Sequence, residues 1–407
     1  MRAKQIGIAV GLTIGFAAGV AHAEQAPVTF SKNVAPIFYS HCVECHRPTM
    51  FAPMSLLTYE DARPWARAIK QRVLSREMPP WGADPAIGHF RNDSRLSQSD
   101  IDMIVAWVDG GAQKGNDADL PARPHFAEGW TIGEPDVVLA MTEPYHIPAR
   151  GTIPYQYIRI PVDFSEDRWL KAIEIRPGSR AHVHHVIAYT QAKGGSLREN
   201  PLGRTNIGGT TPNKPGVVFG DGIARLLRAN SEIVLQMHYT TNGTEADDRT
   251  SVALIFAKEP PKKMLRGGMA LNARFQIPAG APNHEVRAVQ TFNEDTILTS
   301  MTPHMHSRGK DMTYIAHYPD GRSETLLSVP RYDFDWQLTY QLAEPKSLPK
   351  GTTLEVIAHF DNSPNNKSNP DPTALVRWGD QTWEEMMIGF FGTITDVTLD
   401  AMKPSGQ

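Results

Sequence analysis

Apolar side chains recur with two different periods along this sequence, and the change of period divides the chain. From residue 27 to about 115 they recur at helical spacing. Val34, Ile37 and Phe38 share one helical face. A second helix is expected after Ser97, which has the spacing of a capping box with Asp100. The apolar stripe of this second helix consists of Ile101, Ile104, Val105 and Val108.

After a proline-rich linker near 120–124, the helical period gives way to short runs typical of β-strands. The chain contains 32 glycines and 32 prolines, which favours many turns between short strands. Strands are predicted, for example, at 155–162, 233–239, 251–256 and 353–360.

This strand-rich part repeats itself. The motif Ile-Pro-Ala opens one half at 147–149 and the other at 277–279. Each half continues with a strand pair, a histidine pair and an apolar strand that ends in histidine and an aromatic residue. A spacing of 53 residues separates both His185 from His238 and His306 from His359. Two homologous β-domains are the simplest account.

The start of the chain has the features of a signal peptide. Arg2 and Lys4 precede an apolar run over 6–20, which ends in a small-x-small cleavage site at 21–23. We therefore expect cleavage after Ala23 and a periplasmic or secreted protein. No later apolar stretch is long enough for a membrane span. The formal net charge of -3 gives no indication of nucleic-acid binding.

The two cysteines of the chain lie in one motif, Cys42-Val-Glu-Cys45-His46. This spacing is the attachment sequence of a c-type haem, in which both thiols become thioethers and the histidine binds iron. A redox CxxC pair and half a zinc site are the alternatives, but no partner ligands lie nearby at zinc spacing. The two helices beside the motif are similar to a small class I cytochrome c.

The sixth iron ligand of such a haem should be a methionine on a loop that can wrap to the other face of the haem. Met50 lies too close to His46 for this. Met78 lies 32 residues beyond His46 in a proline-rich turn and is the first choice, with Met54 second.

Histidines in the strand-rich part suggest metal sites. His184 and His185 would point to opposite faces of a regular strand, so both can bind one metal only at a strand end or a bulge. His182 shares a face with His184 and is a rival ligand. His304 and His306 share a face and are well spaced for chelation, and His238 ends an apolar strand.

From about residue 130 to 400 the chain resembles the copper type II, ascorbate-dependent monooxygenases, the family of peptidylglycine α-hydroxylating and dopamine β-monooxygenases. The resemblance rests on the histidine pair 184–185, the segment 235–239, the His304 and His306 pair followed by Gly309, and 385–386. It implies an electron-storing copper and an oxygen-binding copper. The ligands of the first would be His184, His185 and His238, and those of the second His304, His306 and Met386.

The sequence departs from that family in ways that bear on the substrate. The family's disulfides are absent, and Val186 stands where its HisHisMet motif has methionine. Thr302 occupies the position of an arginine that binds the carboxylate of peptide substrates, and Ile388 and Phe390 replace substrate-contacting asparagine and tyrosine. A less polar molecule than a peptidyl-glycine is therefore expected. Met387 and His359 stay open as alternative ligands of the second copper.

The sequence thus predicts a signal peptide at 1–23 and a small all-α cytochrome c domain at 24–118. Two all-β, jelly-roll-like sandwich domains are expected at 125–270 and 271–407. The expected protein is an oxidoreductase that uses two coppers and O₂ to hydroxylate an activated C–H bond of a small organic substrate. Electrons would come from a periplasmic donor through the haem. The alternative is a non-catalytic haem and copper electron-transfer protein.

Overall fold

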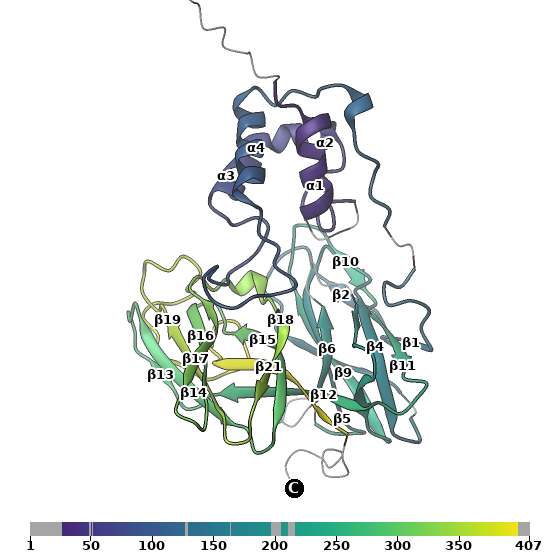
Figure 1. Cartoon of the computed structure of the whole chain (residues 1–407), viewed down its shortest axis with the longest axis vertical. Helices are drawn as coiled ribbons and strands as arrows, with labels where there is room; N and C mark the ends of the chain where they lie inside the picture. Colours follow the sequence, from purple (N-terminus) through teal and green to yellow (C-terminus); the bar gives the residue numbers. More distant parts are fainter. Residues whose placement is uncertain are drawn as a thin grey trace, which may run out of the picture.

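The computed structural model describes residues 27–397, apart from Thr49, Phe51, 127–128, Asp163, 197–204 and 211–215. The predicted signal peptide lies outside the described residues. Strands contain 39% of the residues and helices 13%, so the chain is mainly β. Figure 1 shows two β-sandwiches side by side, with the helical N-terminal segment over one end of both.

The first sandwich is formed by strands between 137 and 256, with its core between two antiparallel sheets. One layer contains β1 (Val137–Ala140), β11 (Ser251–Phe256), β4 (Arg168–Arg176) and β8 (Ile223–Leu227), with β7 (Val217–Val218) beside β4. The other contains, in order, β3 (Gln156–Ile160), β9 (Ser231–Tyr239), β5 (Val183–Ala192) and β6 (Thr205–Thr210). A separate ribbon pairs β2 (Tyr145–Ile147) with β10 (Ala246–Asp248).

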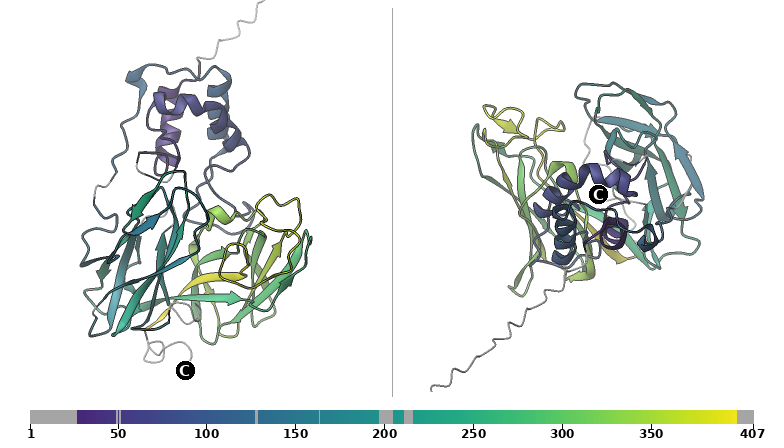
Figure 2. Two further views of the ribbon diagram at one scale, coloured as in Figure 1. Left: turned by 180° about the vertical axis from the view of Figure 1, so that it is seen from behind. Right: turned by 90° about the horizontal axis from the view of Figure 1, so that it is seen from above.

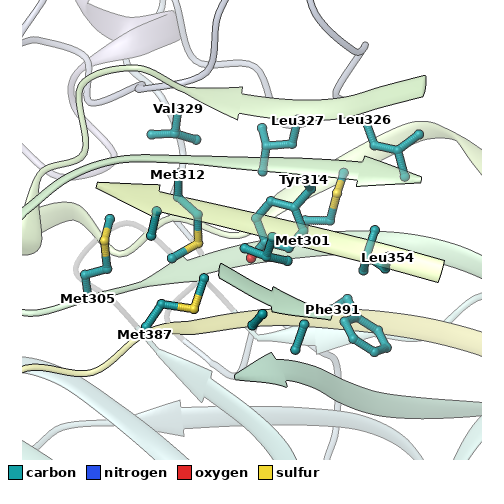
Figure 3. Close-up of a cluster of buried hydrophobic side chains, with 14 of the residues drawn as sticks. Met301, Met305, Met312, Tyr314, Leu326, Leu327, Val329, Leu354, Met387 and Phe391 are labelled. Carbon is teal, nitrogen blue, oxygen red and sulfur yellow. The ribbon is translucent and has the colours of Figure 1, made fainter. Parts of the chain in front are cut away.

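The second sandwich has the same construction. One layer contains β12 (Lys263–Leu271), β21 (Ile388–Asp396), β15 (Thr296–His304) and β18 (Tyr340–Leu348). The other contains, in order, β14 (His284–Thr291), β19 (Thr353–Phe360), β16 (Gly309–His317) and β17 (Ser323–Val329). A ribbon pairs β13 (Gln276–Ile277) with β20 (Val376–Arg377). Figure 3 shows part of the methionine-rich core between these layers.

Strand order supports the predicted duplication. In each four-stranded layer, the first strand in the chain lies at the edge, next to the last strand, which is followed by the second and third. The predicted strands at 251–256 and 353–360 coincide with β11 and β19. His238 and His359 are each the second-last residue of the equivalent strands, β9 and β19.

The two sandwiches are not separate units, because their other layers form one continuous nine-stranded sheet. The link is a short parallel pairing of β8 with β12, in which Ile223 lies opposite Lys263 and Ala224 opposite Met264. β12 in turn pairs along its whole length with β21 of the second sandwich. Hydrogen bonding therefore continues from one half of the chain into the other.

The N-terminal segment contains short helices joined by irregular chain. They are the π-helical turn η1 (Phe30–Val34) and helices α1 (Ala35–His41), α2 (Tyr59–Ala62), α3 (Ala66–Leu74) and α4 (Gln98–Asp109). The predicted capping box is present, since the Ser97 side chain accepts a hydrogen bond from the Asp100 amide at 3.1 Å. Phe30, Phe38 and Trp107 pack together at the centre of the segment.

Part of this segment is built onto the second sandwich. The Asp84 amide donates to the Ser328 carbonyl at 2.8 Å, and the Arg91 amide donates to the Gln341 carbonyl at 2.9 Å. Trp81 packs edge-on against Tyr340, with ring centroids 4.9 Å apart. Figure 2 shows the segment between the two sandwiches when the molecule is seen from above.

The predicted fold class is therefore wrong. In the part of the chain that the structure describes, no separate all-α cytochrome c domain precedes the β part, because this part is mainly strand, its helices are short, and residues 81–92 bond to the second sandwich. The two sandwiches also share one sheet. Within the described residues, none of the helices combines the length and apolar character that a membrane span requires.

Candidate metal centre between the sandwiches

A bulge at the start of β5 brings the adjacent histidines to one place. β5 pairs with β9 such that His185 lies opposite His238, and the register shifts between Val183 and His185. In a regular strand the side chains of His184 and His185 would point to opposite faces, and the bulge redirects the His184 side chain toward His185. As a result, His184, His185 and His238 all lie together.

These three side chains have the geometry of a metal site. Their ligand nitrogens lie within 4.8 Å of one another. The Nδ1 atoms of His184 and His185 are 3.2 Å apart, similar to the ~3.3 Å separation of two nitrogens on one tetrahedral metal. His185 Nε2 and His238 Nδ1 are buried and have no hydrogen-bond partner among the described residues.

The second histidine pair lies where β15 ends and the chain turns toward β16. His304 Nδ1 donates to the Gln337 carboxamide oxygen at 2.7 Å, and His306 Nδ1 donates to the Glu384 carbonyl at 3.2 Å. Each bond fixes the ring and leaves Nε2 for a metal, an arrangement usual for ligating histidines. His306 Nε2 is buried without a hydrogen-bond partner among the described residues.

Two aromatic rings join the histidine sets into one cluster. The Phe334 ring centroid lies 5.9 Å from that of His238 and 5.9 Å from that of His306. The Tyr155 centroid lies 4.9 Å from His238 and 6.4 Å from His306. Phe334 belongs to the short helix η5 (Phe334–Trp336), drawn in light green below the helical segment in Figure 1.

Burial keeps these imidazoles neutral. It lowers the pKa of His304 to about 4 and the pKa values of His238 and His306 to about 3. Desolvation also lowers the pKa of His185, and the neighbouring histidines add to this effect. Neutral imidazole is the form that binds metal ions, and it suits copper. The residues present therefore fit a copper centre.

The two neighbouring methionines differ in what they face. Met386 lines the cavity that also reaches His304, and 7% of it is exposed. Met387 is fully buried in the core of the second sandwich. Figure 3 shows Met387 in the same core as Met301, Met305 and Met312. Of the two methionines, only Met386 borders the cavity.

The two rival histidines lie elsewhere. His182 uses both ring nitrogens: Nδ1 lies 2.8 Å from the Ser179 hydroxyl, and Nε2 donates to Asn242 at 2.9 Å. His359 lies on the outer face of β19, because Ala358 and Phe360 occupy the core face. His359 Nδ1 bonds to the Asp311 carboxylate at 2.7 Å. Neither histidine joins the cluster.

A buried carboxyl group, which the sequence pattern did not single out as functional, fixes the backbone of the second pair. Glu385 accepts hydrogen bonds from the amides of His306 and Arg308, both at 2.7 Å. Burial raises the pKa of Glu385 to about 8. Arg308 is itself buried and donates to Asn362 at 2.8 Å. Because Glu385 directly precedes Met386, these bonds tie the His306 backbone to the chain segment that carries Met386.

The cysteine motif follows α1, and its histidine side chain is held by a hydrogen bond. His46 Nδ1 donates to the Met54 carbonyl at 3.2 Å, which leaves Nε2 for iron. Burial raises the pKa of Cys42 to about 12 and that of Cys45 to about 11. A redox CxxC pair would instead need a lowered thiol pKa.

The methionine candidates for the haem differ in position. The Met54 backbone lies at the Nδ1 edge of the His46 ring, on the side away from Nε2, because its carbonyl accepts the His46 hydrogen bond. Met78 stands at a turn after α3, where its amide donates to the Arg72 carbonyl at 3.3 Å. Met50 instead contacts the first sandwich, with its sulfur 2.9 Å from Arg180 Nη1.

A cavity of about 960 Å³ extends from the metal centre between the sandwiches. His185 borders it from β5, and His304 and Met386 border it from the second sandwich. Beyond them its wall follows alternate residues of β21, namely Ile388, Phe390, Gly392 and Ile394. The candidate metal centre is therefore open to a chamber large enough for a small organic molecule.

No protein-family model matches the chain, and no curated protein matches its sequence. The major capsid protein P2 of bacteriophage PM2 superposes on 65% of this chain and 98% of its own, at 10% identity and a TM-score of 0.28. Allantoicase superposes on 54% of this chain and 78% of its own, at 12% identity and a TM-score of 0.19. Overlaps this weak carry no argument about fold or function.

Proposed function

We propose that this protein is an exported copper monooxygenase that hydroxylates an activated C–H bond of a small organic substrate. A haem c attached to Cys42 and Cys45, with His46 as a ligand, would deliver electrons from a periplasmic donor. The observation that carries the proposal is the cavity, which is bordered by His185 from one histidine set and by His304 and Met386 from the other. An electron-transfer protein has no need of a chamber beside its metal.

Copper, when bound, would supply the one-electron steps and the O₂ chemistry that hydroxylation requires. The residues of this chain determine where copper binds and in what state. His184, His185 and His238 offer nitrogen ligands alone, whereas His304, His306 and Met386 add a sulfur. A thioether favours the reduced, softer ion, so the two sets would hold copper with different preferences.

The surroundings of the ligands exclude water and hold their geometry. Phe334 and Tyr155 pack against the imidazole of His238. Gln337 and the Glu384 carbonyl orient the rings of His304 and His306. Next to them, Ile388 and Phe390 give the cavity an apolar wall, which suits the less polar substrate that the sequence departures indicate.

The N-terminal segment contacts the first sandwich just before the histidines of β5. Met50, in the loop after the CxxCH motif, contacts Arg180, and Arg180 precedes those histidines by a few residues. A haem held by Cys42, Cys45 and His46 would therefore lie on a segment that is attached to the sandwich carrying the three-histidine set.

Oxygen uptake by the copper-loaded, haem-containing chain tests this function. The assay supplies a one-electron reductant, isotopically labelled O₂ and a panel of apolar molecules with benzylic or allylic C–H bonds. We expect substrate-dependent uptake and one labelled oxygen atom in the product. Met386→Ala should abolish labelling, while the matched control Met387→Leu should retain it. Oxygen uptake without any labelled product would favour the electron-transfer alternative.

A further inference from the structure

One arginine in the cavity wall lacks the partner that a buried charge normally has. Arg225 on β8 lines the cavity and is only 9% exposed. Its Nη1 donates to the Asn206 carbonyl, and its Nε has no hydrogen-bond partner among the described residues. No carboxylate in the described part of the chain pairs with it. Burial alone lowers the pKa of Arg225 to about 10.

Two other arginines of the cavity wall are paired with acids: Arg228 bonds to Asp167 at 2.9 Å, and Arg266 lies 3.3 Å from Glu294. Arg91 also lines the cavity, but it is exposed to solvent and donates to the Gln341 carboxamide oxygen. Arg225 is therefore the buried arginine of the described wall that has no paired acid. An unpaired buried charge is costly, and a ligand carboxylate would offset that cost with charge-assisted hydrogen bonds.

The space beside the guanidinium is kept open by glycine. A Cβ on Gly267 would lie 3.7 Å from Arg225 Nη1 and would meet no other atom within 4 Å. Gly267 lies opposite Gly392 in the sheet, and both line the cavity. A ligand group can therefore approach the guanidinium over Gly267, whereas the hydroxyl of Ser300 lies 2.6 Å from the place of a Cβ on Gly392.

The sheet register gives the distance from this point to the metal centre. Gly392 marks the end of the cavity at Arg225, because it lies opposite Gly267. Ile388, on the same strand as Gly392, lies opposite His304 and marks the end at the metal centre. Four residues of strand cover ~13 Å. The wall between them carries the apolar Phe390 from β21 and Met269 from β12.

We infer that Arg225 anchors the carboxylate of an elongated apolar acid whose reacting C–H bond lies at the metal centre. This inference rests on the proposed function and names its substrate class. One unpaired guanidinium matches a single negative charge, and the apolar wall matches a hydrocarbon chain. The ~13 Å span requires a chain of medium length between the carboxylate and the reacting carbon.

Phenylalkanoates test the anchor, because they combine a carboxylate with a benzylic C–H bond at a chosen distance. We would measure binding of 8-phenyloctanoate and its methyl ester to the haem-containing full chain by calorimetry, with and without copper. The acid should bind about 10- to 100-fold more tightly than the ester, as expected for hydrogen bonds to a charged group. A shorter homologue, 4-phenylbutanoate, should give less hydroxylated product because its benzylic carbon stops short of the metal centre.

Arg225→Leu should remove the preference for the acid and leave ester binding unchanged, while Arg225→Lys should keep part of it. Arg228→Leu is the matched control, since Arg228 lines the same cavity but is paired with Asp167, and it should retain the preference. Ligand-free Arg225→Leu should melt at a temperature no lower than that of the wild type, because it removes an uncompensated charge.

Equal affinity of the acid and the ester for the wild type would overturn the anchor, as would an acid preference that survives in Arg225→Leu. Tight, Arg225-dependent binding of the acid without any oxygenated product would uphold the anchor and refute the proposed function. If neutral molecules are oxygenated as well as the corresponding carboxylates, the anchor is refuted and the proposed function is upheld.

Discussion

Met386 and Met387 are neighbours in the sequence but have different surroundings. Met386 borders the cavity, whereas Met387 lies in the core with no exposure. We expect X-ray absorption of the Cu(I) protein to contain a copper–sulfur contribution that disappears in Met386→Ala. Copper at the three-histidine set should remain, because its ligands are all nitrogen.

Met387→Ala is the control for this variant. It should retain the copper–sulfur signal but lower the free energy of unfolding by ~2–5 kcal/mol, because it leaves a cavity in a close-packed core. A sulfur signal that persists in Met386→Ala and disappears in Met387→Ala would refute our placement of the two side chains.

The buried histidines also give the metal-free protein a defined pH dependence. Their pKa values, about 4 for His304 and about 3 for His306, lie below the ordinary value of 6.5. The unfolded chain therefore binds more protons between pH 6.5 and about 4, and the stability of the fold falls as the pH falls through that range. Urea unfolding of chelator-treated protein at pH 7 and pH 5 measures the loss.

The double variant His304→Gln/His306→Gln should show a smaller loss of stability between these two pH values than the wild type. The surface variant His146→Gln serves as a control and should behave like the wild type. If acidification destabilised the double variant as much as the wild type, these two imidazoles would not be the groups responsible.

At the residue scale, the sequence indicated the clustered histidines better than their surroundings. The adjacent His184 and His185 required a bulge, and the register shift in β5 provides one. Phe334, Gln337 and Glu385 were not singled out for a role at the site. Phe334 and Gln337 reach it from a loop without periodicity, and nothing in the local sequence shows which buried backbone amides a carboxylate such as Glu385 will bind.

The connection between β15 and β16 positions the second histidine pair. Gly309, at the start of β16, lies so close to this connection that a Cβ there would come within 2.7 Å of Met305 Cβ and 2.8 Å of the Tyr332 ring. Met305 stands between the two histidines, so Gly309→Ala should displace them. We expect copper affinity at the second site to fall at least ~10-fold, with the three-histidine set unaffected.

Gly129→Ala is the matched control, because a Cβ at Gly129 would meet no atom within 4 Å. Copper titration of both variants, followed by metal analysis after dialysis, measures the two sites. Equal loss of copper from both sites in Gly309→Ala would indicate general unfolding rather than displacement of the pair.

At the element scale, individual strands were predictable and the pairing between halves was not. β19 coincides with its predicted range because its side chains alternate between core and surface, and β11 because its centre is a short run of buried apolar residues. The parallel contact of β8 with β12 involves two residue pairs. So short a contact between distant strands leaves no pattern in the sequence, which is why two separate sandwiches were expected.

At the scale of the whole molecule, the N-terminal segment joins the two sandwiches. Met50 contacts Arg180 on the first, and residues 81–92 bond along β18 and the end of β17 on the second. This stretch has no helical or strand period, so its attachment could not be predicted from the sequence. The helices on either side of it do have such a period, which made an independent domain the natural expectation.

Removal of one side chain distinguishes an attached segment from an independent domain. Trp81 packs against Tyr340 of the second sandwich and against Phe90 of its own segment, with ring centroids 4.9 Å and 5.9 Å away. In Trp81→Ala we expect hydrogen exchange to accelerate at β17 and β18 as well as in the segment, because the apolar cover of Tyr340 is lost. Mass spectrometry of peptides from the full chain measures this.

Trp65→Ala is the comparison that makes this test specific. Trp65 lies between α2 and α3 with 43% of its surface exposed, so its loss should leave exchange in both sandwiches unchanged. If Trp81→Ala accelerated exchange only within residues 27–118, the segment would unfold on its own and its contacts with the second sandwich would contribute nothing. Acceleration that extends to β17 and β18 means that the segment and the second sandwich share one cooperative unit, in which a redox group on the segment would keep a fixed position relative to the histidine cluster.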